Sequence, residues 1–267
     1  MQVWEVGTGR LMATLGGHTG TLRGVALSAD GLLLASCSTD GSVQLWETGS
    51  GRQLLTFEGH AGEVCGVALS PDVRLLVSGG TDGTVRLWEV GTGRQLATLR
   101  AHTGTVRAVA LPAVSRVLAS GGTDGTVRLW DTGSTRLLST LEGHTGGVCG
   151  VAFSADVQLV VSGGEDATVR LWATATGQLL ATLREHTSGV WGVALSTDGR
   201  LVASASFDGT VRLWETSTGG CLRTPRSERP YERLDITGVT GIAAAQRAVL
   251  LALGAIEQPF DGSRSMG

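Results

Sequence analysis

Residues 78–88 read SGGTDGTVRLW, and most of the chain consists of near-copies of this stretch. Its tryptophan is Trp88, and the tryptophans that occupy the same place in the other copies follow at intervals of 42 residues: Trp4, Trp46, Trp130, Trp172 and Trp214. The five histidines of the chain keep the same interval of 42 residues. A period held this strictly indicates an internal repeat, so each motif must be treated as a property of the repeat before any site is assigned.

Each repeat predicts four short strands. In the copy that begins at residue 59, runs of Val, Leu and Ala with polar punctuation cover residues 64–70, 74–80, 84–90 and 94–99. Asp-Gly turns suited to tight hairpins stand at 40–41, 82–83, 124–125 and 208–209, whereas the fourth copy has Asp166-Ala167, a poorer turn. Four antiparallel strands with no helical pattern between them are typical of a β-propeller blade.

The composition limits the classes of function. Hydrophobic residues make up 42% of the 267, and the net charge is −3 with no basic run, which argues against nucleic acid as a partner. The apolar runs fall well short of the roughly 20 residues that cross a bilayer, so no membrane contact is expected. Met1 leads directly into a strand-like pattern, and the four cysteines form no CxxC pair. We therefore expect no signal peptide, reduced thiols and a cytoplasmic location.

The chain has no lysine, because all 21 basic residues are arginine. A phosphate-loop NTPase, a Schiff-base enzyme or a Ser-Lys hydrolase would need one, so these chemistries are excluded on this chain. With one histidine in each repeat and no clustered cysteines, no metal site is predicted. No Gly-rich loop precedes a helix, so no cofactor is expected either.

The repeats resemble the WD-repeat β-propeller family. Its Gly-His pair stands at 17–18, 59–60 and 143–144, with Ala101 and Glu185 in place of the glycine elsewhere. Its Trp-Asp pair occurs at 130–131, and Trp-Glu or Trp-Ala replaces it in the other copies. The resemblance covers residues 2–224 and implies an all-β propeller. Five complete four-stranded blades are expected at residues 16–58, 59–100, 101–142, 143–184 and 185–224, with a partial N-terminal blade at 1–15.

The partial blade matches only the last two strands of a repeat, so either an incomplete six-bladed ring or an open arc is expected, and the chain as a fragment of a longer array is a further alternative. Beyond residue 224 the period stops. Residues 225–267 form a tail in which we expect a strand at 233–237 and one helix at 243–253, ended by Gly254. This tail resembles those that follow WD-repeat arrays in bacterial multidomain signalling ATPases, where the repeats are the sensor.

Every complete repeat carries His, Ser, Asp and Trp at fixed offsets. These tetrads are His18, Ser36, Asp40, Trp46; His60, Ser78, Asp82, Trp88; His102, Ser120, Asp124, Trp130; His144, Ser162, Asp166, Trp172; and His186, Ser204, Asp208, Trp214. Ser, His and Asp also make a hydrolase triad. Each Ser lies inside a strand pattern, however, and five equivalent copies favour a structural role. The resemblance implies that Trp donates to Ser, Ser bonds His, and His bonds Asp, so no catalytic residue is predicted.

If the shared residues hold the blade, function should lie where the copies differ. One such position reads Arg23, Cys65, Arg107, Cys149 and Trp191, and a second, before the turn Asp, reads Thr39, Thr81, Thr123, Glu165 and Phe207. A third holds Glu63. In the family these positions lie on one rim around the channel, where partners dock. The predicted partner-binding residues are Arg23, Glu63, Arg107, Glu165, Trp191 and Phe207. Trp191 and Phe207 would form an aromatic patch, unless Trp191 folds over its own blade.

The third strand of each repeat carries a recurring arginine: Arg86, Arg128, Arg170 and Arg212, with Gln44 in the first copy. It suggests either an anion ring or a solvated strand position, and we favour the second. The resulting prediction is a non-catalytic protein-interaction scaffold or sensor module that also self-associates through open blade edges. A fragment of a bacterial signalling ATPase with no independent role, and a Ser-His-Asp hydrolase, are the alternatives.

Overall fold

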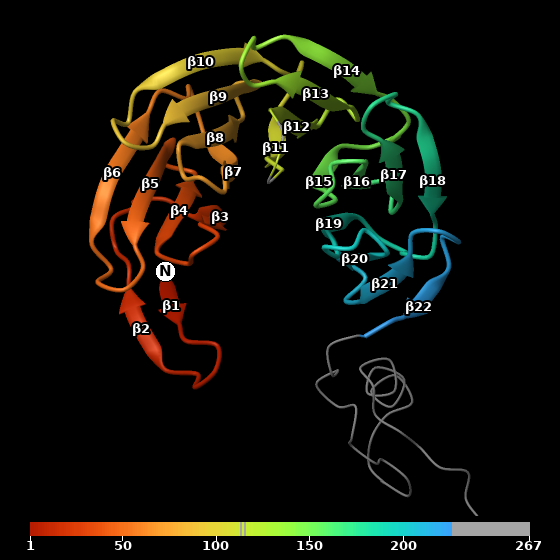
Figure 1. Ribbon diagram of the computed structural model, residues 1–267, viewed down its shortest axis with the longest axis horizontal. Coiled ribbons are helices and arrows are strands. Elements are labelled where there is room, and N and C mark those ends of the chain that lie inside the picture. Colours follow the sequence, from red (N-terminus) through yellow and green to blue (C-terminus); the bar gives the residue numbers. More distant parts are fainter. Residues whose placement is uncertain (113, 115, 226–267) are drawn as a thin grey trace, which may run out of the picture. The chain divides into compact units, whose positions relative to one another are not determined.

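The computed structural model describes residues 1–112, 114 and 116–225, so the strand and helix expected in the tail lie outside the described residues. Met1–Thr224 form one compact unit. All of its described regular structure is β, arranged as five four-stranded antiparallel sheets and one two-stranded hairpin (Figure 1). These sheets are the five complete blades and the partial N-terminal blade that the repeat predicts.

In every complete blade the strands pair in chain order. Blade 1 contains β3 (Leu22–Leu27), β4 (Leu33–Ser38), β5 (Ser42–Glu47) and β6 (Gln53–Glu58). Blade 2 contains β7 (Val64–Leu69), β8 (Leu75–Gly80), β9 (Thr84–Glu89) and β10 (Gln95–Arg100). Blade 3 contains β11 (Val106–Ala110), β12 (Val117–Gly122), β13 (Val127–Asp131) and β14 (Leu137–Leu141). Blade 4 contains β15 (Val148–Phe153), β16 (Leu159–Gly164), β17 (Val169–Ala173) and β18 (Leu179–Leu183). Blade 5 contains β19 (Val190–Leu195), β20 (Leu201–Ser206), β21 (Val211–Glu215) and β22 (Cys221–Arg223).

The first strands of neighbouring blades lie side by side, in the order β3, β7, β11, β15 and β19. Figure 1 shows these strands on the inner side of the unit and β6, β10, β14, β18 and β22 on its outer side. The residues at the start of each first strand are therefore brought toward one another from different blades. This arrangement positions the candidate site.

The hydrophobic core lies between blades rather than within them. Between blades 2 and 3 it contains Val77, Val85, Leu87 and Leu99 from one blade and Val106, Leu118 and Trp130 from the next. The same seven positions, shifted by one repeat, form the cores between the other complete blades. Each blade is thus sealed by its neighbour, since one sheet alone leaves an apolar face uncovered.

The partial blade is a hairpin of β1 (Gln2–Trp4) and β2 (Leu11–Thr14). It packs on blade 1 through Met1, Val3 and Leu15, which cover Leu34 and Trp46. Among the described strands, pairing joins no strand of blade 5 to this hairpin, so the described part of the array is not closed into a ring.

The unfavourable turn of the fourth repeat is accommodated by strain. Ala167 has a φ of 61°, while Gly41, Gly83, Gly125 and Gly209 hold φ between 73° and 85° at the same place. An alanine in this left-handed region costs roughly 1 kcal/mol because its Cβ crowds the following carbonyl. The packing of the blade imposes the turn even though Ala167 disfavours it.

Candidate functional site

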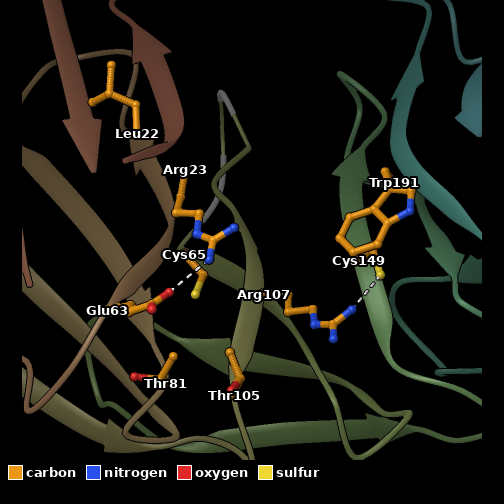
Figure 2. A pocket seen from close by; sticks show the side chains of 9 residues that line it. All are labelled: Leu22, Arg23, Glu63, Cys65, Thr81, Thr105, Arg107, Cys149 and Trp191. Atoms are coloured by element: carbon orange, nitrogen blue, oxygen red, sulfur yellow. Dashed lines mark hydrogen bonds and ion pairs between the residues drawn. The ribbon is translucent and has the colours of Figure 1, made fainter. Parts of the chain in front are cut away.

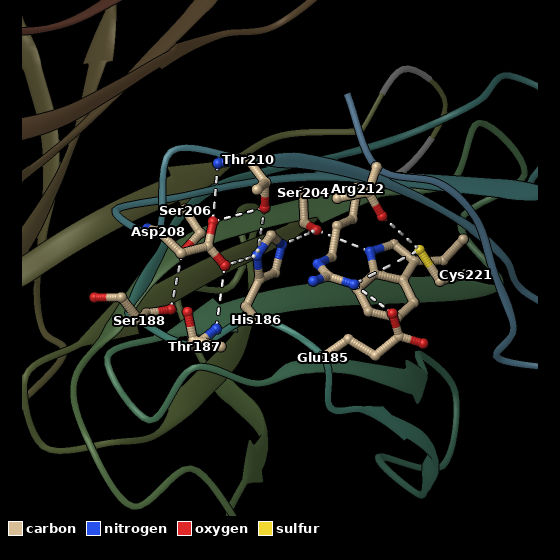
Figure 3. Close-up of polar contacts among 12 residues, drawn as sticks. Glu185, His186, Thr187, Ser188, Ser204, Ser206, Asp208, Thr210, Arg212 and Cys221 are labelled. Atoms are coloured by element: carbon tan, nitrogen blue, oxygen red, sulfur yellow. Dashed lines mark hydrogen bonds and ion pairs between the residues drawn. The ribbon is translucent and has the colours of Figure 1, made fainter. Parts of the chain in front are cut away.

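The four tetrad residues are hydrogen-bonded in all five complete repeats. The Trp indole N–H donates to the Ser Oγ over 2.8–3.1 Å. The same Ser Oγ lies 2.7–2.8 Å from the His Nε2. The His Nδ1 lies 2.8–3.0 Å from a carboxylate oxygen of the turn Asp. Figure 3 shows the set in blade 5, where Ser204, His186 and Asp208 join the second strand, the loop before the first strand and the turn.

The geometry resembles a hydrolase triad, but the serine is inaccessible. Ser36, Ser78, Ser120 and Ser162 have no exposed surface, and Ser204 is 1% exposed. Each Ser Oγ already accepts the indole hydrogen, and its own hydrogen can be donated to His Nε2 while Nδ1–H bonds the carboxylate. A substrate carbonyl could not reach this oxygen, so the arrangement ties three segments of a blade together.

Burial and hydrogen bonding set the charge states of the tetrads in blades 2, 3 and 4. Burial lowers the pKa of His60, His102 and His144, although the neighbouring Asp carboxylates oppose the effect. Burial also raises the pKa of Asp82, but hydrogen bonds from Thr84, Ala61 and His60 outweigh it and bring the pKa to about 2. At neutral pH the pair is therefore a neutral imidazole that donates to a carboxylate, which is the form that the geometry requires.

The interpretation of the recurring arginine as a solvated residue is wrong. The side chains of Arg86, Arg128, Arg170 and Arg212 are only 9–24% exposed. In Arg86 the guanidinium lies 3.9 Å from the carboxylate of Asp82. A Cβ built on Gly59 would stand 2.7 Å from Nη1 of Arg86, so the glycine of the Gly-His pair provides the space that this guanidinium occupies. In blade 5 Glu185 replaces the glycine and forms an ion pair with Arg212 (Figure 3).

A cavity of about 580 Å³ opens at the start of the first strands. It is lined by Leu22, Arg23, Glu63, Cys65, Thr81, Thr105, Arg107, Cys149 and Trp191. Figure 2 shows Arg23, Glu63 and Cys65 on one side, with Arg107, Cys149 and Trp191 on the other. Four of the six residues predicted from differences among the repeats thus line one cavity, and the other two contact members of that lining.

The charged residues of the cavity are paired across blades. Arg23 in blade 1 lies 3.0 Å from the carboxylate of Glu63, which precedes blade 2. Arg107 in blade 3 lies 2.5 Å from Glu165 in blade 4, and it also donates to Sγ of Cys149 over 3.2 Å. The hydrogen bond from Arg107 lowers the pKa of Glu165, so this carboxylate stays ionised. Two arginines and two glutamates leave these four positions electrically balanced.

Trp191 and Phe207 form an exposed aromatic pair. Their ring centroids are 4.7 Å apart at an interplanar angle of 71°, an edge-to-face contact. The guanidinium carbon of Arg107 lies 5.3 Å from the Trp191 ring centroid, within cation–π range. Trp191 is 43% exposed and Phe207 is 70% exposed. The contacts thus run continuously from Glu165 through Arg107 and Trp191 to Phe207.

We use the name rim cluster for Arg23, Glu63, Arg107, Glu165, Trp191 and Phe207. Leu22 and Cys65 line the same cavity but were not among the predicted binding residues. Cys65 and Cys149 occupy the variable position of Arg23 and Trp191, so this offset in the repeat already pointed to them. Burial raises the pKa of both thiols, which keeps them protonated and weakly nucleophilic at neutral pH.

Within the described residues, no group of three or more His, Cys, Asp or Glu side chains is placed to hold a metal ion together. In the same part of the chain there is no helix with the length and apolar character needed to span a bilayer.

Comparison with known proteins identifies the repeat. The sequence profile described as WD domain, G-beta repeat, matches residues 9–47, 51–89, 93–131, 135–173 and 177–215, which together are more than half of the chain. Each match begins two residues before the outer strand that precedes a blade and ends at the last residue of the third strand of that blade. No curated protein matches the chain. On its five repeats, the chain belongs to the WD-repeat family.

Proposed function

We propose that the chain is a non-catalytic protein-binding module and that a partner docks on the rim cluster. The observation that carries the proposal is the exposed pair of Trp191 and Phe207, held over Arg107 beside the 580 Å³ cavity. Tryptophan and arginine are the residues most often found at the energetic centre of protein interfaces. WD repeats generally mediate protein–protein interaction, which is consistent with this role.

The charge balance of the rim cluster indicates the kind of partner. Arg23 and Arg107 are both paired with glutamates, so the surface offers no unbalanced charge that would select an acidic or a basic ligand. The uncovered area is aromatic, and Phe207 replaces the threonines or glutamate of the other repeats. A peptide with an apolar or aromatic anchor fits this surface. Polar groups that flank the anchor would contact the exposed edges of the two ion pairs.

A non-catalytic role agrees with the tetrads. Their serines are buried and each is already bonded to Trp and His, so none is presented to a substrate. We extend the proposal to the setting that the tail resemblance implies, a cytoplasmic sensor module of a bacterial signalling protein that recognises proteins rather than nucleic acid or membrane.

Peptide-display selection tests the docking surface. The wild-type chain should enrich a set of peptides, and Trp191→Ala should lose most of that set while its melting temperature falls by no more than a few degrees. Leu180→Ala is the matched control. Leu180 is 52% exposed on the outer strand β18, so this variant should select the same peptides as the wild type. If Trp191→Ala selects the same peptides as the wild type, the rim cluster is not the docking surface.

Self-association is a second proposed interaction, supported by the outward face of blade 5. Val211 is 44% exposed, whereas its counterparts Val43, Val85, Val127 and Val169 are fully buried by a following blade. A second copy would cover this apolar face. Sedimentation velocity should show association that Val211→Asp abolishes and Leu180→Asp preserves; a wild-type monomer at all concentrations would contradict it.

A further inference from the structure

The turns that join the first and second strands of the blades lie at the opposite end of the first strands from the rim cluster. The cavity of the rim cluster opens at the start of these strands, whereas the turns follow their last residues, as at Ser70 after Leu69 of β7. A second cavity, of about 360 Å³, lies between the turns of blades 2 and 3. We use the name turn cavity for this space, which is lined in part by Pro71, Arg74, Leu75, Pro112, Val114 and Arg116.

Four of the five turns share one hydrogen-bonded construction. In blade 2 the hydroxyl of Ser70 donates to the carboxylate of Asp72 over 2.6 Å, and the same carboxylate accepts the backbone N–H of Arg74. Equivalent hydroxyl bonds are formed by Ser28 with Asp30, Ser154 with Asp156, and Ser196 with Asp198. These hydrogen bonds lower the pKa of the four carboxyls, so each of these turns presents a fixed negative charge.

The turn of blade 3 departs from this pattern. Pro112 stands in place of the serine, and Val114 stands in place of the aspartate. Val114 is 76% exposed, so this turn presents an apolar side chain where the others present a carboxylate. Together with Pro71 and Leu75 of blade 2, Val114 gives the turn cavity an apolar wall.

The same replacement removes the carboxylate that accompanies an arginine in the matching turns. In blade 2, Nε of Arg74 lies 3.9 Å from the carboxylate of Asp72, and the equivalent distance in blade 5 is 4.0 Å. The counterpart in blade 3 is Arg116, and Val114 occupies the place of its aspartate. Arg116 is therefore a cation whose partner in the repeat has been exchanged for an apolar residue.

Asp131 does not restore the balance inside the turn cavity. Two hydrogen bonds from Ser134 lower the pKa of Asp131, and the charge of Arg116 acts in the same direction. The Asp131 carboxylate is thus already bonded by Ser134, and it is not part of the cavity lining. Two arginines and one aspartate, Asp72, line the cavity, so its lining carries a surplus positive charge.

We propose that the turn cavity is a second docking surface and that it binds a short acidic segment of a partner protein. An apolar side chain of that segment packs against Val114, Pro71 and Leu75, and a neighbouring carboxylate pairs with Arg116. The site is independent of the rim cluster, because the two surfaces lie at opposite ends of the first strands.

The lining favours a peptide over a nucleic acid. A phosphate backbone carries a charge at every nucleotide and is bound by several cations that follow it. In the turn cavity a single surplus arginine lies beside apolar residues and the ionised carboxylate of Asp72. This combination matches an apolar side chain next to one carboxylate.

A displayed library of short peptides with a fixed central leucine is the probe. The bait is the full chain with Trp191→Ala, which weakens the rim cluster and leaves the turn cavity unchanged. Enriched peptides should carry Asp or Glu beside the leucine and should be depleted in Lys and Arg. The most enriched peptide, labelled with a fluorophore, should bind the wild-type chain and Trp191→Ala with the same affinity in an anisotropy titration.

Two substitutions in blade 3 test the roles of the lining. Val114→Asp restores the residue that the other turns hold, so the fold should be kept. It removes the apolar wall and adds a repelling carboxylate, so affinity for the selected peptide should fall at least about tenfold. Arg116→Gln should weaken binding by about threefold to fivefold, as expected for one exposed ion pair. Arg200→Gln is the matched control, because Arg200 has the same place in blade 5 and should leave the affinity unchanged.

Three results would overturn the proposal. The first is a selection that enriches no acidic peptides, or that enriches basic peptides equally. The second is equal affinity of the selected peptide for the wild type, Val114→Asp and Arg116→Gln. The third is a chain that associates with itself and that Val114→Asp dissociates, since a second copy would then be the occupant of the turn cavity.

Discussion

Ser78 accepts a hydrogen bond of 2.9 Å from the indole of Trp88, and neither residue is reachable from solvent. The same Ser Oγ lies 2.8 Å from Nε2 of His60, so one small hydroxyl satisfies two larger side chains. Its position ten residues before the tryptophan recurs in every complete repeat, which makes this contact the smallest repeating unit of the fold.

Ser78→Ala should lower the free energy of unfolding by about 1–3 kcal/mol, because Trp88 and His60 would both lose a buried partner. Urea unfolding followed by fluorescence measures the change. Ser50→Ala is the control, since Ser50 is exposed and its hydroxyl bonds the exposed groups of Glu47 and the backbone N–H of Arg52. A stable Ser78→Ala protein would show that a water replaces the hydroxyl, and the proposed structural role would be wrong.

Ala167→Gly should raise the free energy of unfolding by roughly 1 kcal/mol, because glycine accepts the φ of 61° without strain. Gly209→Ala is the reverse substitution at the matching turn of blade 5. There φ is 79° and a new Cβ would meet nothing within 4 Å, so this change isolates the backbone effect and should destabilise by a similar amount. Thermal melts of both variants provide the test, and opposite signs are required.

Trp191 and Trp214 lie in one blade but should differ greatly on replacement by alanine. Trp214 is 1% exposed in the core between blades 4 and 5, and its loss should cost about 3–5 kcal/mol. Trp191 is 43% exposed and contacts Phe207 and Arg107, so its loss should cost clearly less than that of Trp214, about 1–2 kcal/mol. A large stability loss in Trp191→Ala would identify Trp191 as a core residue rather than a docking residue.

Stability should fall with acid in two stages. Burial lowers the pKa of His60, His102 and His144 in the folded chain. Below pH about 6.5 these imidazoles therefore bind protons in the unfolded chain but not in the folded chain. The pKa of Asp82 and Asp124 is about 2 in the folded state against 3.8 ordinarily, so a second loss follows between about pH 4 and pH 2. In both stages the unfolded state binds more protons, and stability therefore rises with pH.

Urea unfolding at a series of pH values from 8 to 3 measures this profile. His60→Gln removes one titrating imidazole, so its loss of stability between pH 7 and pH 5 should be shallower than that of the wild type. A profile that is flat between pH 7 and pH 5 would show that these imidazoles titrate normally in the folded chain.

The period of 42 residues predicted strand positions well because local pattern and turn chemistry agree. Residues 64–70 were expected as a strand, and β7 covers Val64–Leu69. The exposure of the recurring arginine was not predictable from alternation along its strand. It depends on Gly59, which is distant in sequence from Arg86 and provides space for the guanidinium.

For the rim cluster, sequence comparison among repeats found the variable positions but not their pairing. That Trp191 and Phe207 could meet followed from their shared repeat. The ion pair of Arg107 and Glu165 joins different blades, and its geometry depends on how two blades pack. The period alone contains no information on that packing at the level of side-chain atoms.

The placement of each core across two blades has a consequence for changes in chain length. Since every core uses the same seven positions, deleting 42 residues would bring one half-core against a matching half from a blade further on. A deletion whose length is not a multiple of 42 residues would bring positions together that are not equivalent in the repeat. Whole repeats can therefore be added to or removed from this architecture without creating a new type of interface between blades.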